Sequence, residues 1–134
     1  MSHLQNSQQR HWLWLWSRGC FRWIWIGNSL EAVKSFPQAV RSEVGFALYQ
    51  VQTGGKHVNA KPLRGFGAGV LEIVSDHRGD TFRAVYTVRL ASRVYVLHAF
   101  QKKSKTGIAT PKAEMELVRR RLKRAMELNA ALEK

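Results

Sequence analysis

Basic side chains crowd the second half of the sequence, and their types and spacing point to chemistry on an anion. Between residues 83 and 124, twelve Lys or Arg residues stand against two acidic residues, which leaves a charge of +10. The whole chain has 134 residues and a net charge of +13, so about a third of it holds most of that charge. Such a balance favours a polyanionic partner, namely nucleic acid, an anionic membrane or an acidic protein. The concentration on one segment favours a phosphate backbone over a merely soluble basic face.

One arginine falls at an unusual place in this segment. In the strand expected over residues 81–90, one side is apolar and forms the core face: Phe82, Ala84, Tyr86, Val88 and Leu90. Arg83 then lies on the opposite face, between two neighbouring strands. Its burial costs free energy unless it meets an anion. That anion is either a phosphate or a carboxylate of the chain itself, for which Glu72 is the candidate.

His98 is the second titratable candidate. It falls in the strand expected over residues 94–100, and alternation places it on the same face as Val94, Val96 and Phe100. A lone histidine among apolar residues is either a hydrogen-bonded packing residue or an acid/base group.

A glycine-rich stretch precedes the strands. Lys61 and Arg64 lead into Gly65–Gly69, whose backbone N–H groups can wrap a phosphate. The stretch lacks the Gly-Lys-Ser/Thr ending of a P-loop, so a flexible lead into a strand is the alternative. The basic residues that we expect to contact nucleic acid are Lys61, Arg64, Arg89, Arg119, Arg120 and Lys123.

Seven elements position these residues. Strands are expected over residues 22–26, 70–74, 81–90 and 94–100, and helices over 30–36, from Pro37 to the Gly54-Gly55 pair, and from Thr110-Pro111 onward. Ser29 and Thr110 are the expected helix caps. The helix after Pro37 has an apolar stripe of Val40, Val44, Ala47, Leu48 and Val51. The last helix has an apolar stripe of Met115, Val118, Leu122, Ala125 and Met126. The order β-α-α-β-β-β-α predicts an α+β domain with a small, mostly antiparallel sheet, two helices on one side and a basic C-terminal helix.

The N-terminal twenty residues differ in composition from the rest. Their apolar run, Trp12–Trp16, is far below the ~20 residues of a bilayer span. We interpret residues 1–20 as an extension, disordered or assigned ahead of the true start, with an interfacial anchor as the alternative. Residues 21–134 form the domain. The single cysteine, Cys20, excludes an internal disulfide framework and fits a reduced, cytoplasmic setting without a membrane partner.

Three stretches resemble the RelE/ParE superfamily of toxins from bacterial type II toxin–antitoxin systems, specifically its HigB-like, phage-derived branch. They are residues 61–67 (KPLRGFG), 81–86 (TFRAVY) and 94–106 (VYVLHAFQKKSKT). The last stretch is the most specific, and it continues into Thr110-Pro111 and the Arg-rich helix as in that branch. The resemblance covers roughly residues 21–128.

The resemblance implies a microbial-ribonuclease-like toxin fold and an endonuclease that cuts mRNA on the translating ribosome, with no metal or other cofactor. The implied partner is a cognate antitoxin, often a helix-turn-helix protein. RNA carries its own nucleophile, the 2′-OH, so cleavage needs a base, a cation at the phosphate and an acid. By resemblance Arg83 holds the phosphate. Lys102, Lys103 and Lys105 stabilise charge or donate a proton, and Glu72 or His98 is the base.

The sequence also departs from the superfamily. Some ribosome-dependent members carry catalytic lysines on the strand before the arginine strand, and this chain has Glu72 there. Two other functions therefore stay open. One is a ParE-like toxin that inhibits DNA gyrase without cutting RNA, and the other is a plain RNA-binding module. Phe66, Tyr86 and Phe100 are candidates to stack a base, although each also suits a core.

Overall fold

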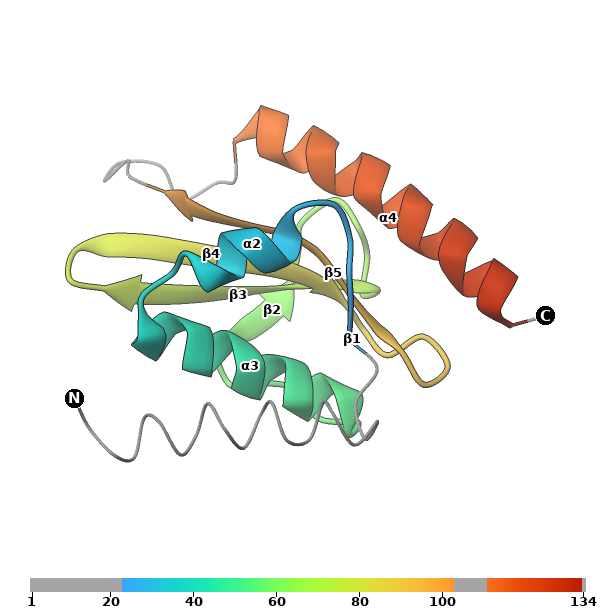
Figure 1. The fold of residues 1–134 in the computed structure, drawn as a ribbon, viewed down its shortest axis with the longest axis horizontal. Coiled ribbons are helices and arrows are strands. Elements are labelled where there is room, and N and C mark those ends of the chain that lie inside the picture. The colour runs from blue at the N-terminus through green and yellow to red at the C-terminus, as the bar shows by residue number, and fades with distance from the viewer. Residues whose placement is uncertain (1–22, 103–110, 134) are drawn as a thin grey trace.

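The computed structural model describes residues 23–102 and 111–133, and within these ranges three helices flank a five-stranded sheet (Figure 1). The strands are β1 (Trp23–Trp25), β2 (Ala60–Pro62), β3 (Val70–His77), β4 (Asp80–Thr87) and β5 (Val94–Lys102). Their order across the sheet is β1-β5-β4-β3-β2. β1 runs parallel to β5 and every other pair is antiparallel. The α+β class is thus confirmed.

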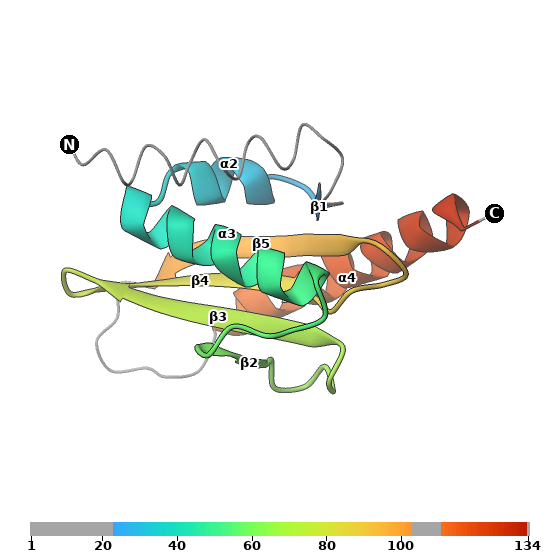
Figure 2. The same ribbon diagram turned by 90° about the horizontal axis from the view of Figure 1, so that it is seen from below.

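The helices cover both faces of the sheet. They are α2 (Ser29–Lys34), α3 (Gln38–Gln52) and α4 (Lys112–Leu132), and Figure 2 shows α2 and α3 on one side and α4 on the other. The α2/α3 face holds the larger apolar core, in which Val40, Leu48 and Ile73 are almost fully buried. A smaller cluster, including Val85 and Val118, joins the sheet to α4.

The helix α3 follows the expected apolar pattern. Val40, Val44, Ala47, Leu48 and Val51 form the buried stripe of α3. Pro37 caps α3 rather than opening it, and a left-handed Gly54 (φ 94°) follows its end. The capping role expected for Ser29 is wrong. Its hydroxyl is buried and donates to the carbonyl of Val96 at 3.1 Å, so it ties α2 to β5 instead.

The strands differ from the expectation in two places. β2 lies between the Gly54-Gly55 pair and residue 70, where no strand was expected. Its three residues pair with β3 but have no apolar pattern of their own that would predict a strand. β4 ends at Thr87, whose hydroxyl accepts the backbone N–H of Tyr95 at 3.0 Å. Leu90 therefore leaves the strand, and it packs in the α4-side cluster rather than on the face of Phe82.

A β-bulge changes which face of the sheet the β5 side chains lie on. Val85 pairs with His98 whereas Tyr86 pairs with Val96, so Leu97 is an extra residue on β5. Val96 thus faces α2 and α3, while His98 faces α4 with Val85. The sequence expectation that His98 shares a face with Val94 and Val96 is wrong, because strict alternation does not survive a bulge.

The last helix packs on the sheet through its middle and is also hydrogen-bonded to β5 near its end. Val118 and Ala125 are buried, and Tyr95 donates its hydroxyl to Asn129 at 2.9 Å. Pro111 is its N-cap, so the proline precedes the helix, and Thr110 lies outside the described residues. Met126 is 50% exposed, which corrects its expected place in the buried stripe.

The extension at residues 1–20 lies outside the described residues. Among the helices that the structure describes, none has both the length and the apolarity that crossing a bilayer requires.

Candidate functional site

The α4 face of the sheet gathers the titratable residues that the sequence singled out. Residues directly opposite each other on paired strands share a face. The register therefore produces three rows on the α4 face: Lys61, Glu72, Val85 and His98; then Val74, Arg83 and Phe100; then Asp76, Thr81 and Lys102. Glu72, Arg83 and His98 thus come from three adjacent strands. Strands lie about 4.8 Å apart.

A buried ion pair stands at the centre of these rows. Arg83 donates from Nη1 to Oε2 of Glu72 at 2.9 Å, and their side chains are 7% and 4% exposed. This confirms the carboxylate partner considered for Arg83 in the sequence. Two charges out of water are tolerated only when they meet in good geometry. The pair therefore gives the site a cation, Arg83, that is already held in place. The carboxylate that holds it, Glu72, is a potential proton acceptor.

The lysine cluster is only partly within the described residues. Lys102 is 8% exposed at the end of β5, on the same face as Arg83. Lys103 and Lys105 lie outside the described ranges. Within those ranges, no three His, Cys, Asp or Glu side chains come together in a group able to hold a metal ion.

His98 is held from both sides by α4. Its Nε2 contacts the carboxylate of Glu114, and its Nδ1 lies 3.4 Å from Nη1 of Arg121. Because a guanidinium can only donate, Nδ1 faces it as an acceptor and the ring proton belongs on Nε2. The imidazole ring also stacks on Phe100, with ring centroids 5.2 Å apart. In this arrangement His98 fixes the start of α4 against β5.

Arg121 extends the same junction to the N-terminal part of the chain. It donates from Nη1 to the carbonyl of Leu97 at 3.0 Å and from Nη2 to Oδ1 of Asn28 at 2.7 Å. Burial lowers the pKa of Arg121, as does the neighbouring Arg120 to a smaller extent, while Glu114 opposes the shift. A Cβ on Gly27 would come within 2.8 Å of the guanidinium, so a larger residue there would have to displace it.

The glycine-rich stretch also packs beside α4. The guanidinium of Arg119 lies over the Phe66 ring, 5.0 Å from its centroid, and Phe66 is half-buried. Lys61 and Arg64 are exposed nearby in the chain. Of the three aromatic candidates for base stacking, Tyr86 is fully buried on the α2/α3 face, and its hydroxyl is inside the core. Phe66 and Phe100 are the two that lie at the α4 face.

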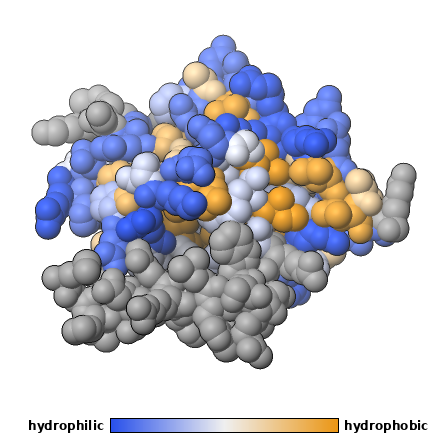
Figure 3. Space-filling view, in the orientation of Figure 1, coloured by the Kyte–Doolittle hydropathy of each residue, from blue (hydrophilic) through white to orange (hydrophobic). Residues whose placement is uncertain are grey.

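The remaining basic candidates divide between the two faces. Arg119, Arg120 and Lys123 are exposed on α4, and the region of α4 is largely hydrophilic in Figure 3, with smaller apolar patches. Arg89 is not among them. It follows β4 and donates to the carbonyl of Gln52, at the end of α3, at 3.1 Å. The structure therefore separates Arg89 from the other candidates.

Sequence reasoning missed Glu114 and Arg121 as members of the site. Glu114 was counted only as one of two acids in a basic segment, and Arg121 only as one of many cations. One signal was present. A helix whose residues 114 and 121 are two turns apart presents both on one side, and that side also carries the buried Val118.

The fold and the site define an α+β protein with a preformed cationic centre on one sheet face and a basic helix above it. The chain belongs to the family of phage-derived Gp49-like proteins, whose model matches residues 31–123, more than half of the chain. The match begins in α2, ends in α4 and includes Glu72, Arg83, His98 and Lys102. No curated protein matches the chain. Membership of this family is compatible with a toxin of a toxin–antitoxin system.

Proposed function

We propose that this protein is the toxin of a type II toxin–antitoxin system and an endoribonuclease that cuts mRNA on the ribosome. Its implied fold family is the RelE/ParE superfamily. The observation that carries the proposal is the convergence of Glu72, Arg83 and His98 on one face of three adjacent strands. Membership of the phage-derived Gp49-like family supports it.

The arrangement suits attack of the RNA 2′-OH on its own phosphate. In-line displacement requires the attacking and leaving oxygens on opposite sides of phosphorus. A phosphate over the middle strand, at Arg83, has β3 on one side and β5 on the other. Glu72 on β3 accepts the 2′-OH proton while the new O–P bond forms. Cleavage of the bond to the 5′-oxygen then leaves a 2′,3′-cyclic phosphate, and the 5′-oxygen takes a proton from β5.

The ion pair explains how the base is released. In the free protein the Glu72 carboxylate is held by Arg83 at 2.9 Å. A scissile phosphate competes for the same guanidinium, since both are anions that bind it through charge-assisted hydrogen bonds. As Arg83 turns to the phosphate, the carboxylate gains freedom to accept a proton. Substrate binding and activation of the base are thereby one event.

Two side chains of β5 are candidates to return the proton. His98 lies in the row of Glu72, and its Nε2 contacts the carboxylate of Glu114. Lys102 lies two rows away on the same face. His98→Gln and Lys102→Gln distinguish them, because the variant that lacks the donor loses the alkaline limb of the pH–rate profile.

The exposed cations of α4 hold the remaining RNA backbone.

An antitoxin is the implied partner, and the cytoplasm the implied location. A surface of one dominant sign attracts an acidic protein by electrostatic complementarity. A small helix-turn-helix protein encoded beside this chain would be the direct genetic support.

The decisive experiment induces the full chain in a bacterium and maps 5′ ends of mRNA. The wild-type protein is expected to arrest growth and create new ends, and Arg83→Ala to reduce cleavage by about 10²-fold or more, because the phosphate loses its cation. Arg83→Gln repeats the test with a side chain that still hydrogen-bonds. Arg41→Ala, on α3, is the matched control and keeps full activity.

The other outcomes separate the alternatives. Growth arrest with DNA damage signalling and no new RNA ends would refute the nuclease and support the gyrase-inhibiting toxin. Salt-sensitive RNA binding without toxicity would reduce the protein to an RNA-binding module. Circular dichroism of each purified variant ensures that a loss of activity is not a loss of fold.

A further inference from the structure

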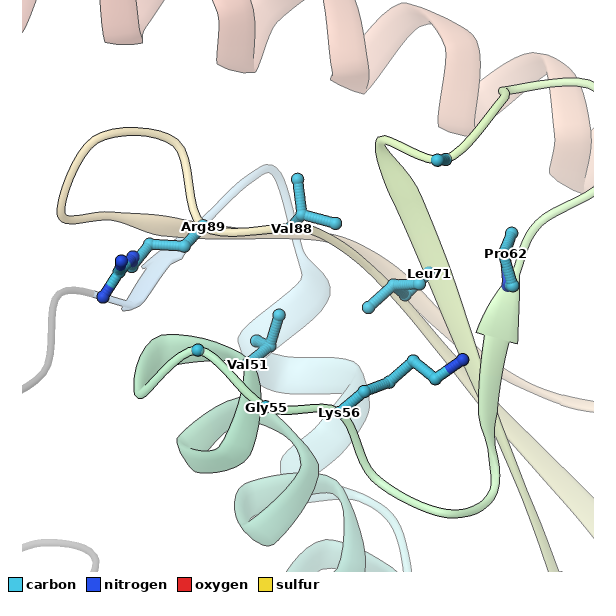
Figure 4. Close-up of a pocket in the computed structure, with 9 residues that line it drawn as sticks. Val51, Gly55, Lys56, Pro62, Leu71, Val88 and Arg89 are labelled. Carbon is cyan, nitrogen blue, oxygen red and sulfur yellow. The ribbon is translucent and has the colours of Figure 1, made fainter.

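A hollow opens at the end of the sheet on the α3 side, away from the rows of Glu72 and Arg83. Its volume is about 450 Å³ and it is open to solvent on one side. Figure 4 shows Val51, from α3, and Leu71, from β3, directed toward it, and Val88, on the segment after β4, lines its edge. The other lining residues are Gly54, Gly55, Lys56, Pro62, Ala68 and Arg89.

The hollow combines an apolar floor with a cationic rim. Val51 and Leu71 belong to the main core, so the floor is rigid. Lys56 and Arg89 supply the positive charge, and Arg89 is fixed by its hydrogen bond to the carbonyl of Gln52. Val58, which is 89% exposed, lies on the segment between Lys56 and β2. Val58 is thus an exposed apolar side chain on the loop that begins at the rim of the hollow.

We propose that this hollow docks a partner protein through one large apolar side chain flanked by acidic residues. The proposal goes beyond the proposed function and assigns a second binding surface, on the face that does no chemistry. The apolar floor requires an apolar anchor, while Lys56, Arg89 and the net charge of +13 select acidic flanks by charge complementarity. A nucleic acid fits less well, because the described residues that line the hollow include no aromatic side chain to stack a base.

The position of the hollow has a functional consequence. α3 and α4 lie on opposite sides of the sheet (Figure 2). A partner seated on the α3 side leaves the row of Glu72 and Arg83 uncovered. Binding there is compatible with RNA at the α4 face, so the partner and the substrate need not compete.

The test uses the full-length protein and a displayed library of random peptides. Enriched peptides are expected to carry a large apolar residue between Asp or Glu residues. Ala68→Trp fills the hollow from an exposed loop position, and we expect it to weaken the enriched peptides at least about tenfold. Lys56→Glu is expected to weaken them about threefold or more, an effect that added salt reduces. Arg120→Glu, on α4, is the charge-matched control and leaves peptide binding unchanged.

The proposal is overturned if enriched peptides bind the Ala68→Trp variant as well as the wild type. It is equally overturned if no peptide is enriched, if acidic residues suffice without the apolar one, or if a short RNA displaces the peptide. Thermal unfolding confirms that Ala68→Trp folds. Since Lys56→Glu changes a residue outside the candidate RNA-binding set and is expected to cleave mRNA normally, failure of the docking surface and failure of the nuclease give different results.

Discussion

The two faces of the sheet use the same strands for different purposes. On the α2/α3 face, alternate residues such as Ile73, Ala84 and Ala99 pack in a continuous apolar core. On the α4 face, the neighbouring residues Glu72, Arg83 and His98 are charged or titratable, and nearly as buried. The apolar face stabilises the fold, because it removes most of the apolar surface from water. The α4 face can therefore hold desolvated charges that contribute little to stability, and this division makes room for chemistry.

The largest expected effect comes from breaking the Glu72–Arg83 pair. Arg83→Met leaves the Glu72 carboxylate buried and uncompensated, and we expect it to cost about 3–5 kcal/mol of unfolding free energy. The double variant Glu72→Leu/Arg83→Met removes both charges and is expected to regain most of that loss. It should nevertheless remain inactive. Urea unfolding and mRNA cleavage, measured on all three proteins, separate the stability of the pair from its function.

A variant on the opposite face of the sheet is the control for the comparison of these three proteins. Leu48→Ala, in the core under α3, is expected to cost a similar ~2–5 kcal/mol through the cavity that it creates. Its folded fraction should cleave RNA at the wild-type rate. If Leu48→Ala lost activity per folded molecule, or if the double variant stayed as unstable as Arg83→Met, the division between the two faces would be refuted.

Periodicity in the sequence could predict most elements but not the arrangement of the site. The apolar stripe of α3 and the alternation around Arg83 correctly predicted which side of each element is buried. Both patterns repeat within a single element that packs against the core, so the sequence of that element is sufficient to predict them. The facing of His98 could not be predicted, since the bulge at Leu97 depends on pairing with β4. β2 was missed for a related reason, as residues 60–62 become a strand only beside β3.

The site was predicted best where its residues lie on neighbouring strands of the meander. Glu72 was the carboxylate candidate for Arg83 on the adjacent strand, and the structure confirms their contact. The contacts of Glu114 and Arg121 with His98 join residues 16 and 23 positions apart, across two elements. Nothing in one sequence specifies how α4 is placed on the sheet. That placement depends on tertiary packing at Val118 and Ala125.

A smaller effect is expected where α4 meets the turn before α2. Gly27→Ala forces alanine into a left-handed conformation (φ 58°) and brings its Cβ against Arg121. The left-handed backbone alone costs about 1–2 kcal/mol. The clash adds to it, because Arg121 is held by Asn28 and Leu97 and cannot move away without losing those bonds.

A double-mutant cycle isolates the clash at this junction. In the Arg121→Ala background, Gly27→Ala should cost only the backbone strain, so we expect a coupling of about 0.5–1 kcal/mol between the two positions. Chemical denaturation of the four proteins measures it. Equal costs of Gly27→Ala in both backgrounds would show that Arg121 does not close over Gly27.

The smallest effect concerns Tyr86, whose phenol is buried inside the apolar face. Burial raises the pKa of Tyr86, and its hydroxyl has no hydrogen-bond partner among the described residues. Because the pKa of Tyr86 is raised in the folded protein, its phenol contributes its full stability below the ordinary tyrosine pKa of about 10. Above that pH the free energy of unfolding falls, since this tyrosine ionises in the unfolded chain before it ionises in the folded protein. Tyr86→Phe should change stability by less than about 0.5 kcal/mol at neutral pH. Above about pH 10 the unfolding free energy of Tyr86→Phe should exceed that of the wild type by up to ~1.4 kcal/mol for each further pH unit, measured by urea unfolding. Parallel curves for the two proteins would mean that water reaches this phenol, and that the α2/α3 face is not sealed from solvent.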